Sequence, residues 1–387
     1  MDDRPIDAGL PSLERLLDVA AVQKAAVEGG KLGATTHSLR RKTTAWVPGV
    51  GCTATFEIRT DARGGRPDDV LLVRATPTGW QFARAVDDPA LPGLGPTLAG
   101  HHPEHSTGAM TIVSYKPGES CVVDLGQRRF AKVVPPERLG ALRLAFDALG
   151  EVAARDPAAP GVPAVLSVDA SLGILVMERV EGTPLHDLLS ESPAAAKRSC
   201  EQLGSSLAAM HLHRNTPLDR RDVHDDDDEV RRCIAAATTV SPEIGNRLEA
   251  LLDVATARAL ALPGGEIGPA HGVLRTDQAI VNDGRPVLVD LDGACAAPPE
   301  RDLANLSAYL WWRSVRRPGD SGPLLAMADA AKLGWRHAPD APRLDDEVAR
   351  VWRALSLLKI AGRRYRNLTR AEWPLVPQLL DEAAACL

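Results

Sequence analysis

Residues 271–292 read HGVLRTDQAIVNDGRPVLVDLD, and this stretch decides the fold of the chain. A His-Gly pair opens a loop, and the amide side chain of Gln278 follows within that loop. Asn282-Asp283-Gly284 then has the residue types of a two-residue type I′ hairpin turn. The apolar run after the turn ends at Asp290 and Asp292. The pattern predicts a loop and a β-hairpin that bring an amide and two carboxylates together.

Oxygen ligands in this arrangement suit a divalent cation. Asp290 is a hard carboxylate at the end of an expected buried strand, and Gln278 supplies a second oxygen. Asp292 is a further candidate ligand, or a group that orients one. The alternative is a plain β-hairpin whose acidic residues have no function. The agreement of spacing, turn and flanking residues favours a metal site at Gln278 and Asp290.

A lysine within an apolar run is the second candidate site residue. Lys132 lies in Phe130-Ala-Lys-Val-Val134, directly before a Pro-Pro pair that begins a predicted helix over residues 135–154. Such a lysine can bind phosphates, although a strand can equally direct a lysine to solvent. The helix offers Glu137, Asp147 and Glu151 as acidic partners, and their spacing does not choose between them.

The texture of the sequence changes about half-way along the chain. Residues 12–27 have helical spacing, residues 35–134 consist mainly of short β-branched runs that predict antiparallel strands, and the sequence from residue 193 is mainly helical. We therefore expect an N-terminal helical segment (1–34), a β-rich lobe (35–180) and a helical lobe (181–387) that contains the hairpin. Within the β-rich region, residues 46–52 (WVPGVGC) and 115–121 (YKPGESC) share one pattern, which indicates a duplicated hairpin or a coincidence.

These motifs, in this order, resemble those of the aminoglycoside phosphotransferases and related small-molecule kinases, which carry H-G-D-x-x-x-x-N followed by D-x-D. The resemblance covers roughly residues 105–387 and is strongest over residues 271–304. It implies an α+β, bilobal, protein-kinase-like fold with a β-rich N-lobe and a mostly helical C-lobe. It also implies ATP and Mg²⁺ as cofactors. Val273 occupies the position of the family's catalytic Asp, and Gln278 the position where the family has Asn.

The resemblance implies roles for further residues. Residues 174–185 (ILVMERVEGTPL) resemble the hinge, where backbone groups of Glu178 and Val180 bind adenine and Met177 controls access to the pocket. The alternative for this segment is an ordinary connection between a strand and a helix. Asp147 lies nearest to the spacing of the family's acidic partner for the lysine, although the family usually has Glu there. Residues 115–120 could lie over the triphosphate, and Asp302 matches an Asp that braces the catalytic loop.

Val273 determines the functional expectation, because valine cannot accept a proton. A positioned base contributes on the order of 10²–10⁴ in rate, so its loss should nearly abolish ordinary kinase chemistry. Our leading hypothesis is a pseudokinase that binds nucleotide and serves as a partner or peptide-binding subunit in a biosynthetic pathway. The alternative is an active ATP-dependent phosphotransferase that acts on a small-molecule hydroxyl or a peptide Ser/Thr. Asp277 is then the candidate substitute for the missing base.

Bulk properties exclude several classes of protein. A formal charge of −6 and a pI near 6.0 give no basic footprint for nucleic acid. The six cysteines form no C-x-x-C pair, and no apolar run is long enough to span a membrane. With no apolar signal core near residue 1, we expect a cytoplasmic protein. The acidic run at residues 224–229 is expected to be a solvated loop, or otherwise a contact for a cationic substrate.

Overall fold

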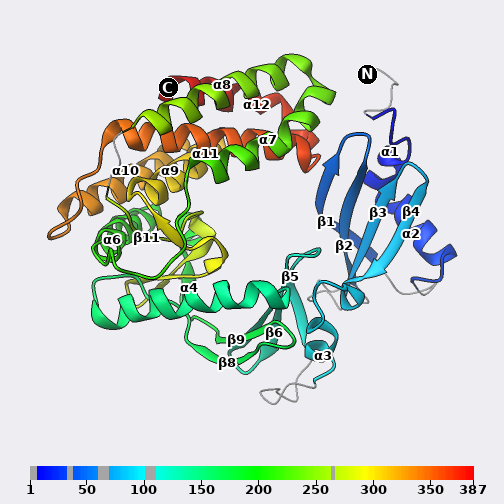
Figure 1. Ribbon diagram of the computed structural model, residues 1–387, viewed down its shortest axis with the longest axis horizontal. Coiled ribbons are helices and arrows are strands. Elements are labelled where there is room, and N and C mark those ends of the chain that lie inside the picture. Colours follow the sequence, from blue (N-terminus) through cyan, green and yellow to red (C-terminus); the bar gives the residue numbers. More distant parts are fainter. Residues whose placement is uncertain (1–6, 33–37, 60–68, 101–109, 263–265) are drawn as a thin grey trace.

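The computed structural model describes residues 7–32, 38–59, 69–100, 110–262 and 266–387, except the side chains of Leu189 and Ser190. Figure 1 shows a β-sheet with helices at the N-terminal end, a second sheet beneath a long helix, and a helical half that contains the C-terminus. The described chain is therefore α+β, with a β-rich N-lobe and a helical C-lobe, as the sequence predicts. The predictions for residues 1–6 and for the other gaps lie outside the described residues.

The strands are β1 Ser38–Val47, β2 Gly51–Arg59, β3 Asp69–Thr76, β4 Gly79–Arg84, β5 Thr111–Lys116, β6 Ser120–Gly126, β7 Arg129–Val133, β8 Val165–Asp169, β9 Ile174–Glu178, β10 Thr183–Pro184, β11 Gly268–Ala270, β12 Ala279–Asn282, β13 Arg285–Leu288 and β14 Cys295–Ala297. The α-helices are α1 Leu13–Leu17, α2 Val19–Glu28, α3 Leu94–Leu98, α4 Pro136–Arg155, α5 Leu185–Glu191, α6 Pro193–His211, α7 Val223–Val240, α8 Pro242–Ala261, α9 Glu300–Arg316, α10 Ser321–His337, α11 Asp346–Arg366 and α12 Val376–Cys386.

The β-rich region consists of two separate antiparallel sheets. The first has the order β1-β2-β3-β4, and the second has the order β5-β6-β7-β9-β8. The second sheet carries Lys132 on β7. Helix α4 connects β7 to β8, and the connection to the C-lobe follows β9. Strand β9 ends at Glu178 and β10 begins at Thr183, which is where the sequence places the boundary between the lobes.

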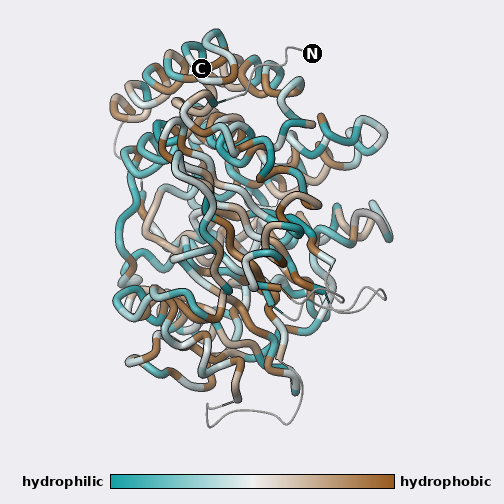
Figure 2. The backbone as a smooth tube through the Cα atoms, turned by 90° about the vertical axis from the view of Figure 1, so that its right-hand side faces the viewer, coloured by the Kyte–Doolittle hydropathy of each residue, from teal (hydrophilic) through white to brown (hydrophobic). Residues whose placement is uncertain are grey.

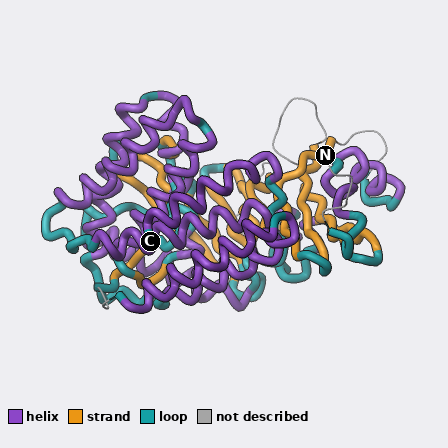
Figure 3. Tube along the Cα trace, turned by 90° about the horizontal axis from the view of Figure 1, so that it is seen from above, coloured by secondary structure: helices purple, strands orange, loops and turns teal. Residues whose placement is uncertain are grey.

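The N-terminal sheet packs against both lobes. One face of this sheet and helices α1 and α2 share a continuous apolar core with α7, α8, α11 and α12 of the C-lobe. At the other end, Val70 of β3 joins the core of the second sheet. In the view of Figure 3 the N-terminal sheet lies at one end of the molecule, away from most of the helices. The sheet is thus an additional element fixed to both lobes.

Two helix predictions are refined by the structure. The segment expected to be one helix over residues 12–27 is two helices, because Asp18 is extended (φ −84°, ψ 107°) and its side chain accepts from the N–H of Ala20 at 2.9 Å. The expectation that residues 224–229 form a solvated loop is wrong. They form the start of α7, where Asp226 and Asp227 are buried, because Asp222 and Asp225 make a reciprocal capping box before them.

The helices of the C-lobe are amphipathic. Figure 2 shows brown apolar and teal polar residues alternating along them, which is the pattern of helices that bury one face. Helices α6 and α10 pack closely enough that glycines are required: a Cβ on Gly204 would lie 1.8 Å from the carbonyl oxygen of Ala331. Within the described residues, no helix is both long and apolar enough to cross a membrane.

Candidate active site

Lys132, Asp290 and Asp292 meet in one cluster between the two lobes. Lys132 Nζ lies 2.9 Å from Asp290 Oδ1 and also forms an ion pair with Asp292 Oδ1. Strand β7 places the lysine, and the end of the β12–β13 hairpin places both carboxylates. Asp290 adopts a left-handed backbone conformation (φ 61°), which turns the chain directly after the strand. The structure therefore brings together the strand lysine and the strand-end carboxylates that the sequence singled out.

The electrostatics of the cluster favour the charged forms. Burial opposes ionisation of Lys132, but the carboxylates of Asp292 and Asp290 outweigh it and raise the pKa of the lysine. Burial also opposes ionisation of Asp290, and the positive charges of Lys132 and Lys116 lower the pKa of this carboxyl well below its usual range. Lys132 is almost fully buried, whereas 36% of the Asp290 side chain is exposed and accessible to a ligand.

Gln278 lies beside Asp290 but is oriented as a hydrogen-bond donor. Its Nε2 donates to Asp290 Oδ2 at 3.2 Å, and its Oε1 accepts from the N–H of Arg275 at 2.9 Å. Glutamine is one methylene longer than the family's asparagine, so its oxygen can reach back to the loop. The carboxylates of Asp290 and Asp292 fit a hard divalent cation. The Gln278 oxygen would have to leave Arg275 to become a ligand.

The loop that begins at His271 is braced from α9. Asp302 accepts from the N–H of His271 and from the N–H of Gly272, each at 2.8 Å, and its side chain is fully buried. Arg301 Nε donates to the Gly272 carbonyl at 3.1 Å, and Asn305 Nδ2 donates to the Leu274 carbonyl at 2.8 Å. Three residues of α9 therefore fix the backbone on both sides of residue 273.

A buried ionic network lies behind this brace. Asp226 of α7 is fully buried and bonds to Arg301 at 2.6 Å, to Lys359 at 2.7 Å and to Arg221 at 3.2 Å. Burial alone would raise the pKa of Asp226, but Lys359, Arg301 and Arg221 lower it to about 2. This network could not be foreseen, because nothing in a run of acidic residues shows which one a helix will bury.

Val273 is half-buried at the position of the missing base and faces Gly293. A Cβ on Gly293 would lie 2.8 Å from Val273 Cγ2. Asp277, the candidate substitute, is exposed, and its two oxygens accept from Arg275 Nε at 3.0 Å and from Arg275 at 3.1 Å through a terminal nitrogen. The Asp277 carboxylate is thus paired on the surface of the loop.

Asp147 is not the partner of Lys132. It is exposed on α4 and accepts from Arg143 Nε through both oxygens, at 2.8 and 2.7 Å. The phase of the helix is the reason: Glu137, Arg138, Leu142 and Ala145 line a cavity that α4 shares with Asp292, and Asp147 is not among the residues that line it. Lys132 obtains its negative partners from Asp290 and Asp292 instead.

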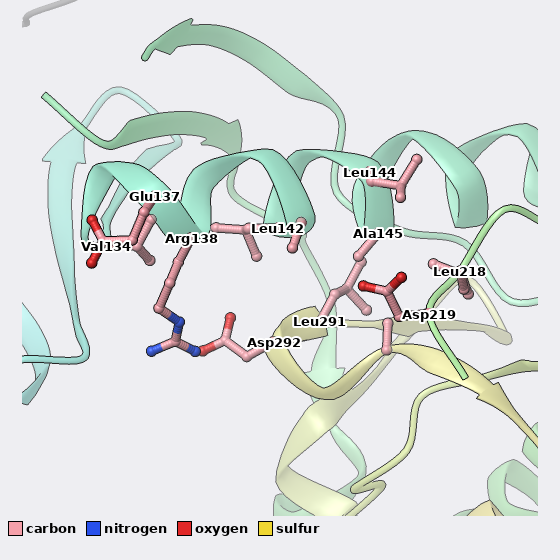
Figure 4. Close-up of a pocket in the computed structure, with 12 residues that line it drawn as sticks. Val134, Glu137, Arg138, Leu142, Leu144, Ala145, Leu218, Asp219, Leu291 and Asp292 are labelled. Atoms are coloured by element: carbon pink, nitrogen blue, oxygen red, sulfur yellow. The ribbon is translucent and has the colours of Figure 1, made fainter. Parts of the chain in front are cut away.

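A cavity of about 280 Å³ separates α4 from the segment that contains Asp292. Figure 4 shows Arg138 of α4 extending toward Asp292, and the carboxylate of Asp219 near Leu291 and Ala145. A second cavity of about 350 Å³ shares Asp219 and Asp292 and runs along residues 293–295 toward α7. Asp219 is therefore a carboxylate near the site that the sequence motifs did not identify.

The segment that is expected to be the hinge connects β9 to β10. In the register of β7 and β9, Met177 pairs with Phe130 and Leu175 pairs with Lys132, so Met177 lies on the same face as the lysine. The N–H of Glu178 donates to the Ala164 carbonyl at 2.9 Å. Among the described residues, the N–H of Val180 has no backbone partner. This N–H is the backbone donor of the segment that remains available to a nucleobase.

Three further residues lie near the site, and the sequence motifs gave none of them an individual role, although Lys116 belongs to the loop 115–120 that is expected over the triphosphate. Phe130 lies two residues before Lys132 on the same face of β7, and the guanidinium of Arg179 lies 5.8 Å from its ring centroid. Lys116, at the end of β5, acts on Asp290 by its charge. Arg138 donates to the Glu119 carbonyl at 3.3 Å. The alternation of β7 could have identified Phe130, but the other two depend on how loops and helices pack.

Comparison with known proteins decides the family. The model of the phosphotransferase enzyme family, APH, matches residues 119–343, which is more than half of the chain. The chain belongs to this family. No characterised protein with curated function matches the sequence significantly.

Two solved kinase structures share the fold. An amicoumacin kinase in complex with AMP-PNP, Ca²⁺ and Ami superposes with a TM-score of 0.53 at 13% identity, covering 72% of this chain and 89% of that one. The GDP and kanamycin complex of APH(2")-IIia superposes with a TM-score of 0.52 at 13% identity, covering 75% and 98%. At these identities the likeness shows the kinase-like fold and leaves the acceptor substrate open.

Proposed function

We propose that this phosphotransferase-family chain is a nucleotide-binding pseudokinase that serves as a binding subunit, for a peptide or protein partner or for a small hydroxylated ligand. The observation that carries the proposal is the contrast within one site. Lys132, Asp290 and the Asp302 brace are retained in a compact arrangement, while Val273 occupies the position of the base. The binding parts of the site are kept, and the proton acceptor is absent.

Several contacts support nucleotide and metal binding. Asp290 and Asp292 would hold Mg²⁺, which would neutralise phosphate charge when bound. Lys132 would then exchange a carboxylate oxygen for a phosphate oxygen. The positive charge of Lys116 also lowers the pKa of the Asp290 carboxyl. The N–H of Val180 would donate to the nucleobase, and Met177 would limit the depth of the nucleobase pocket. The solved relatives named above are complexes with AMP-PNP and GDP, which agrees with this assignment.

The geometry around residue 273 supports the loss of transfer chemistry. Val273 packs on Gly293, and the brace from α9 holds both sides of the loop, so the backbone has little freedom to bring another group to this position. Asp277 is engaged by Arg275 through both oxygens. To act as a base, it would have to break both bonds and turn inward.

A second candidate function is an active phosphotransferase, and one observation favours it. Asp219 and Asp292 line both cavities beside the site, so a carboxylate other than Asp277 lies close to where an acceptor could bind. Phosphoryl transfer has a loose transition state and depends mainly on positioning and electrostatics. An acceptor hydroxyl in the second cavity could then lose its proton to Asp219.

Titration with ATP and GTP, each with and without Mg²⁺, tests the proposal when it is paired with an assay of nucleotide hydrolysis. We expect binding that Mg²⁺ strengthens and turnover near the background rate. Absence of binding of either nucleotide would exclude a nucleotide-dependent role. Robust turnover that Asp219→Asn abolishes would instead establish the phosphotransferase.

A further inference from the structure

The two hairpins that share a sequence pattern also share their geometry. In the first, Trp46 pairs with Cys52, and in the second, Tyr115 pairs with Cys121. Both turns close with the same backbone bond: Val50 N–H to the Val47 carbonyl at 3.1 Å, and Glu119 N–H to the Lys116 carbonyl at 3.0 Å. Gly49 and Gly118 have the same φ of 69°. Such a left-handed glycine is what each Pro-Gly turn requires.

A buried aspartate from outside the hairpin holds each turn. Asp7 Oδ2 accepts from Trp46 Nε1 at 2.9 Å and from the N–H of Gly49 at 2.8 Å. Asp88 Oδ2 accepts from the Tyr115 hydroxyl and from the N–H of Gly118, each at 2.8 Å. One carboxylate oxygen therefore joins the aromatic ring and the turn glycine in both places.

The segments that carry these aspartates are also equivalent. Residues 7–13 read DAGLPSL and residues 88–94 read DPALPGL, so both follow D-x-x-L-P-x-L. In each, the second carboxylate oxygen caps its own segment: Gly9 N–H donates to Asp7 at 2.9 Å, and Ala90 N–H donates to Asp88 at 3.1 Å. Each segment leads into a five-residue helix, α1 or α3. Four shared features, in the same order, identify one unit that occurs twice.

The two turns differ in what they face. The turn of the second unit lies beside the site: the Glu119 carbonyl accepts from Arg138 of α4 at 3.3 Å, and Arg138 lines the same cavity as Asp292. The positive charge of Lys116 also lowers the pKa of Asp290. The equivalent residues of the first unit are Val47 and Val50, which are 49% and 66% exposed. The first turn therefore has apolar side chains where the second has charged ones. The family match begins at residue 119, so the first unit lies entirely outside it.

We propose that the N-terminal sheet is a second copy of the hairpin unit of the N-lobe, and that Asp88 is a positioning residue that holds residues 116–120 so that Lys116 faces the phosphates. The role of Asp88 rests on the nucleotide binding proposed above. Because Asp88 occupies the N–H of Gly118, the turn offers the phosphates the ammonium group of Lys116 rather than this amide. Asp7 holds a turn of the same shape whose equivalent side chains, Val47 and Val50, are apolar and exposed, so it is a natural control.

Matched variants test this role. Asp88→Asn removes the charge from the double acceptor and should weaken binding of ATP with Mg²⁺, or of GTP if the chain prefers it, by about tenfold. Asp7→Asn should lower Tm by about as much as Asp88→Asn does, but it should leave the affinity for the nucleotide unchanged. If Asp88→Asn unfolds the protein, Tyr115→Phe is the milder variant. It removes the hydrogen bond from the Tyr115 hydroxyl to Asp88 and keeps the bond from the Gly118 N–H to Asp88. Equal effects of Asp7→Asn and Asp88→Asn on affinity, or no effect of either, would overturn the proposal.

A double-mutant cycle distinguishes positioning from a general loss of stability. In a Lys116→Met background, Asp88→Asn should change affinity by less than about twofold, because the group that it positions is gone. Additive effects would assign Asp88 a purely structural role.

Hydrogen exchange tests the latch without any ligand. Exchange should rise at residues 116–120 in Asp88→Asn and at residues 47–51 in Asp7→Asn, and unchanged exchange would refute the latch. If the parent binds no nucleotide while exchange rises as expected, the proposed function fails and the duplicated latch stands.

Discussion

Lys132 Nζ lies 2.9 Å from Asp290 Oδ1, so the strand lysine of the N-lobe and the strand-end carboxylate of the C-lobe neutralise each other directly. A nucleotide and its metal ion would have to insert between these groups. Lys132 would then exchange the carboxylate for a phosphate oxygen, and Asp290 would exchange the ammonium group for the cation. Breaking this pair would leave a buried ammonium group that needs a replacement partner, which a bound phosphate would have to supply.

The first prediction concerns the metal. Asp290→Ala should remove the Mg²⁺ dependence of nucleotide affinity, which in the parent should be at least about tenfold. Lys132 would keep Asp292 as a partner, so the fold should survive. Isothermal titration with and without Mg²⁺ measures the effect. Asp277→Ala is the matched control, because Asp277 lies in the turn directly before the same hairpin, and it should behave like the parent. Equal Mg²⁺ dependence in the parent and in Asp290→Ala would place the metal elsewhere.

The second prediction concerns the hinge. Met177→Trp adds a large ring on the face of β9 that carries the site, and it should weaken nucleotide binding by about a hundredfold or more through steric exclusion. Leu166→Trp is the control, because Leu166 is 45% exposed on the neighbouring strand. If Met177→Trp binds the nucleotide with the affinity of the parent, the nucleobase is not bound at the hinge.

The third prediction concerns the buried network behind the loop. Asp226→Asn leaves Lys359 and Arg301 buried without a full counter-charge, and it should lower the free energy of unfolding by about 3–5 kcal/mol. Asp228→Asn, on the exposed side of the same acidic run, should change it by less than about 0.5 kcal/mol. Urea denaturation measures both. Equal stabilities would show that Asp226 does not carry the network.

The fourth prediction concerns pH. His211 is buried against Trp335, and burial lowers its pKa to about 4 despite the nearby Asp302. In the unfolded chain the pKa is about 6.5, so between these values the unfolded state binds more protons than the native state. Stability is therefore lost as the pH falls from about 6.5 to 4, by up to about 3 kcal/mol from this residue.

Denaturation across this pH range measures the effect of His211. His211→Gln should flatten the slope between pH 4 and 6.5, whereas substitution of the exposed His224 should leave the slope as it is in the parent. A slope that His211→Gln leaves unchanged would exclude His211 as its source.

Local patterns predicted the elements that depend on local chemistry. The turn at Asn282–Gly284, the strand around Lys132 and the strand-end carboxylates follow from turn residues, β-branched runs and spacing, and the structure has all of them. These features do not depend on distant partners. A one-residue shift of β7 would direct Lys132 to the opposite face, and the sequence alone left open whether this lysine faces the site or the solvent.

Features that depend on packing could not be predicted in this way. Asp147 was chosen by spacing, yet the phase of α4 relative to the site decides which side chains face it, and that phase depends on the cores on both sides of the helix. Asp226 lies in a run of acidic residues whose members differ only in the face of α7 that they occupy. The latches at Asp7 and Asp88 join segments distant in sequence, so a hairpin pattern alone could not reveal them.

The last prediction concerns Val273. If the loop keeps its braced conformation, Val273→Asp places a carboxylate at the position of the family's base. Turnover of the bound nucleotide should then rise by about 10–100-fold over the parent, since a positioned base contributes up to about 10²–10⁴. Val273→Asn is the matched control, because it has the same shape but cannot accept the proton. Asp277→Asn should be silent, because Arg275 already engages that carboxylate. Steady-state hydrolysis assays on the three variants distinguish the two functions. A parent that turns over robustly, and that loses its activity in Asp277→Asn or Asp219→Asn, would contradict the pseudokinase and identify the residue that replaces the base.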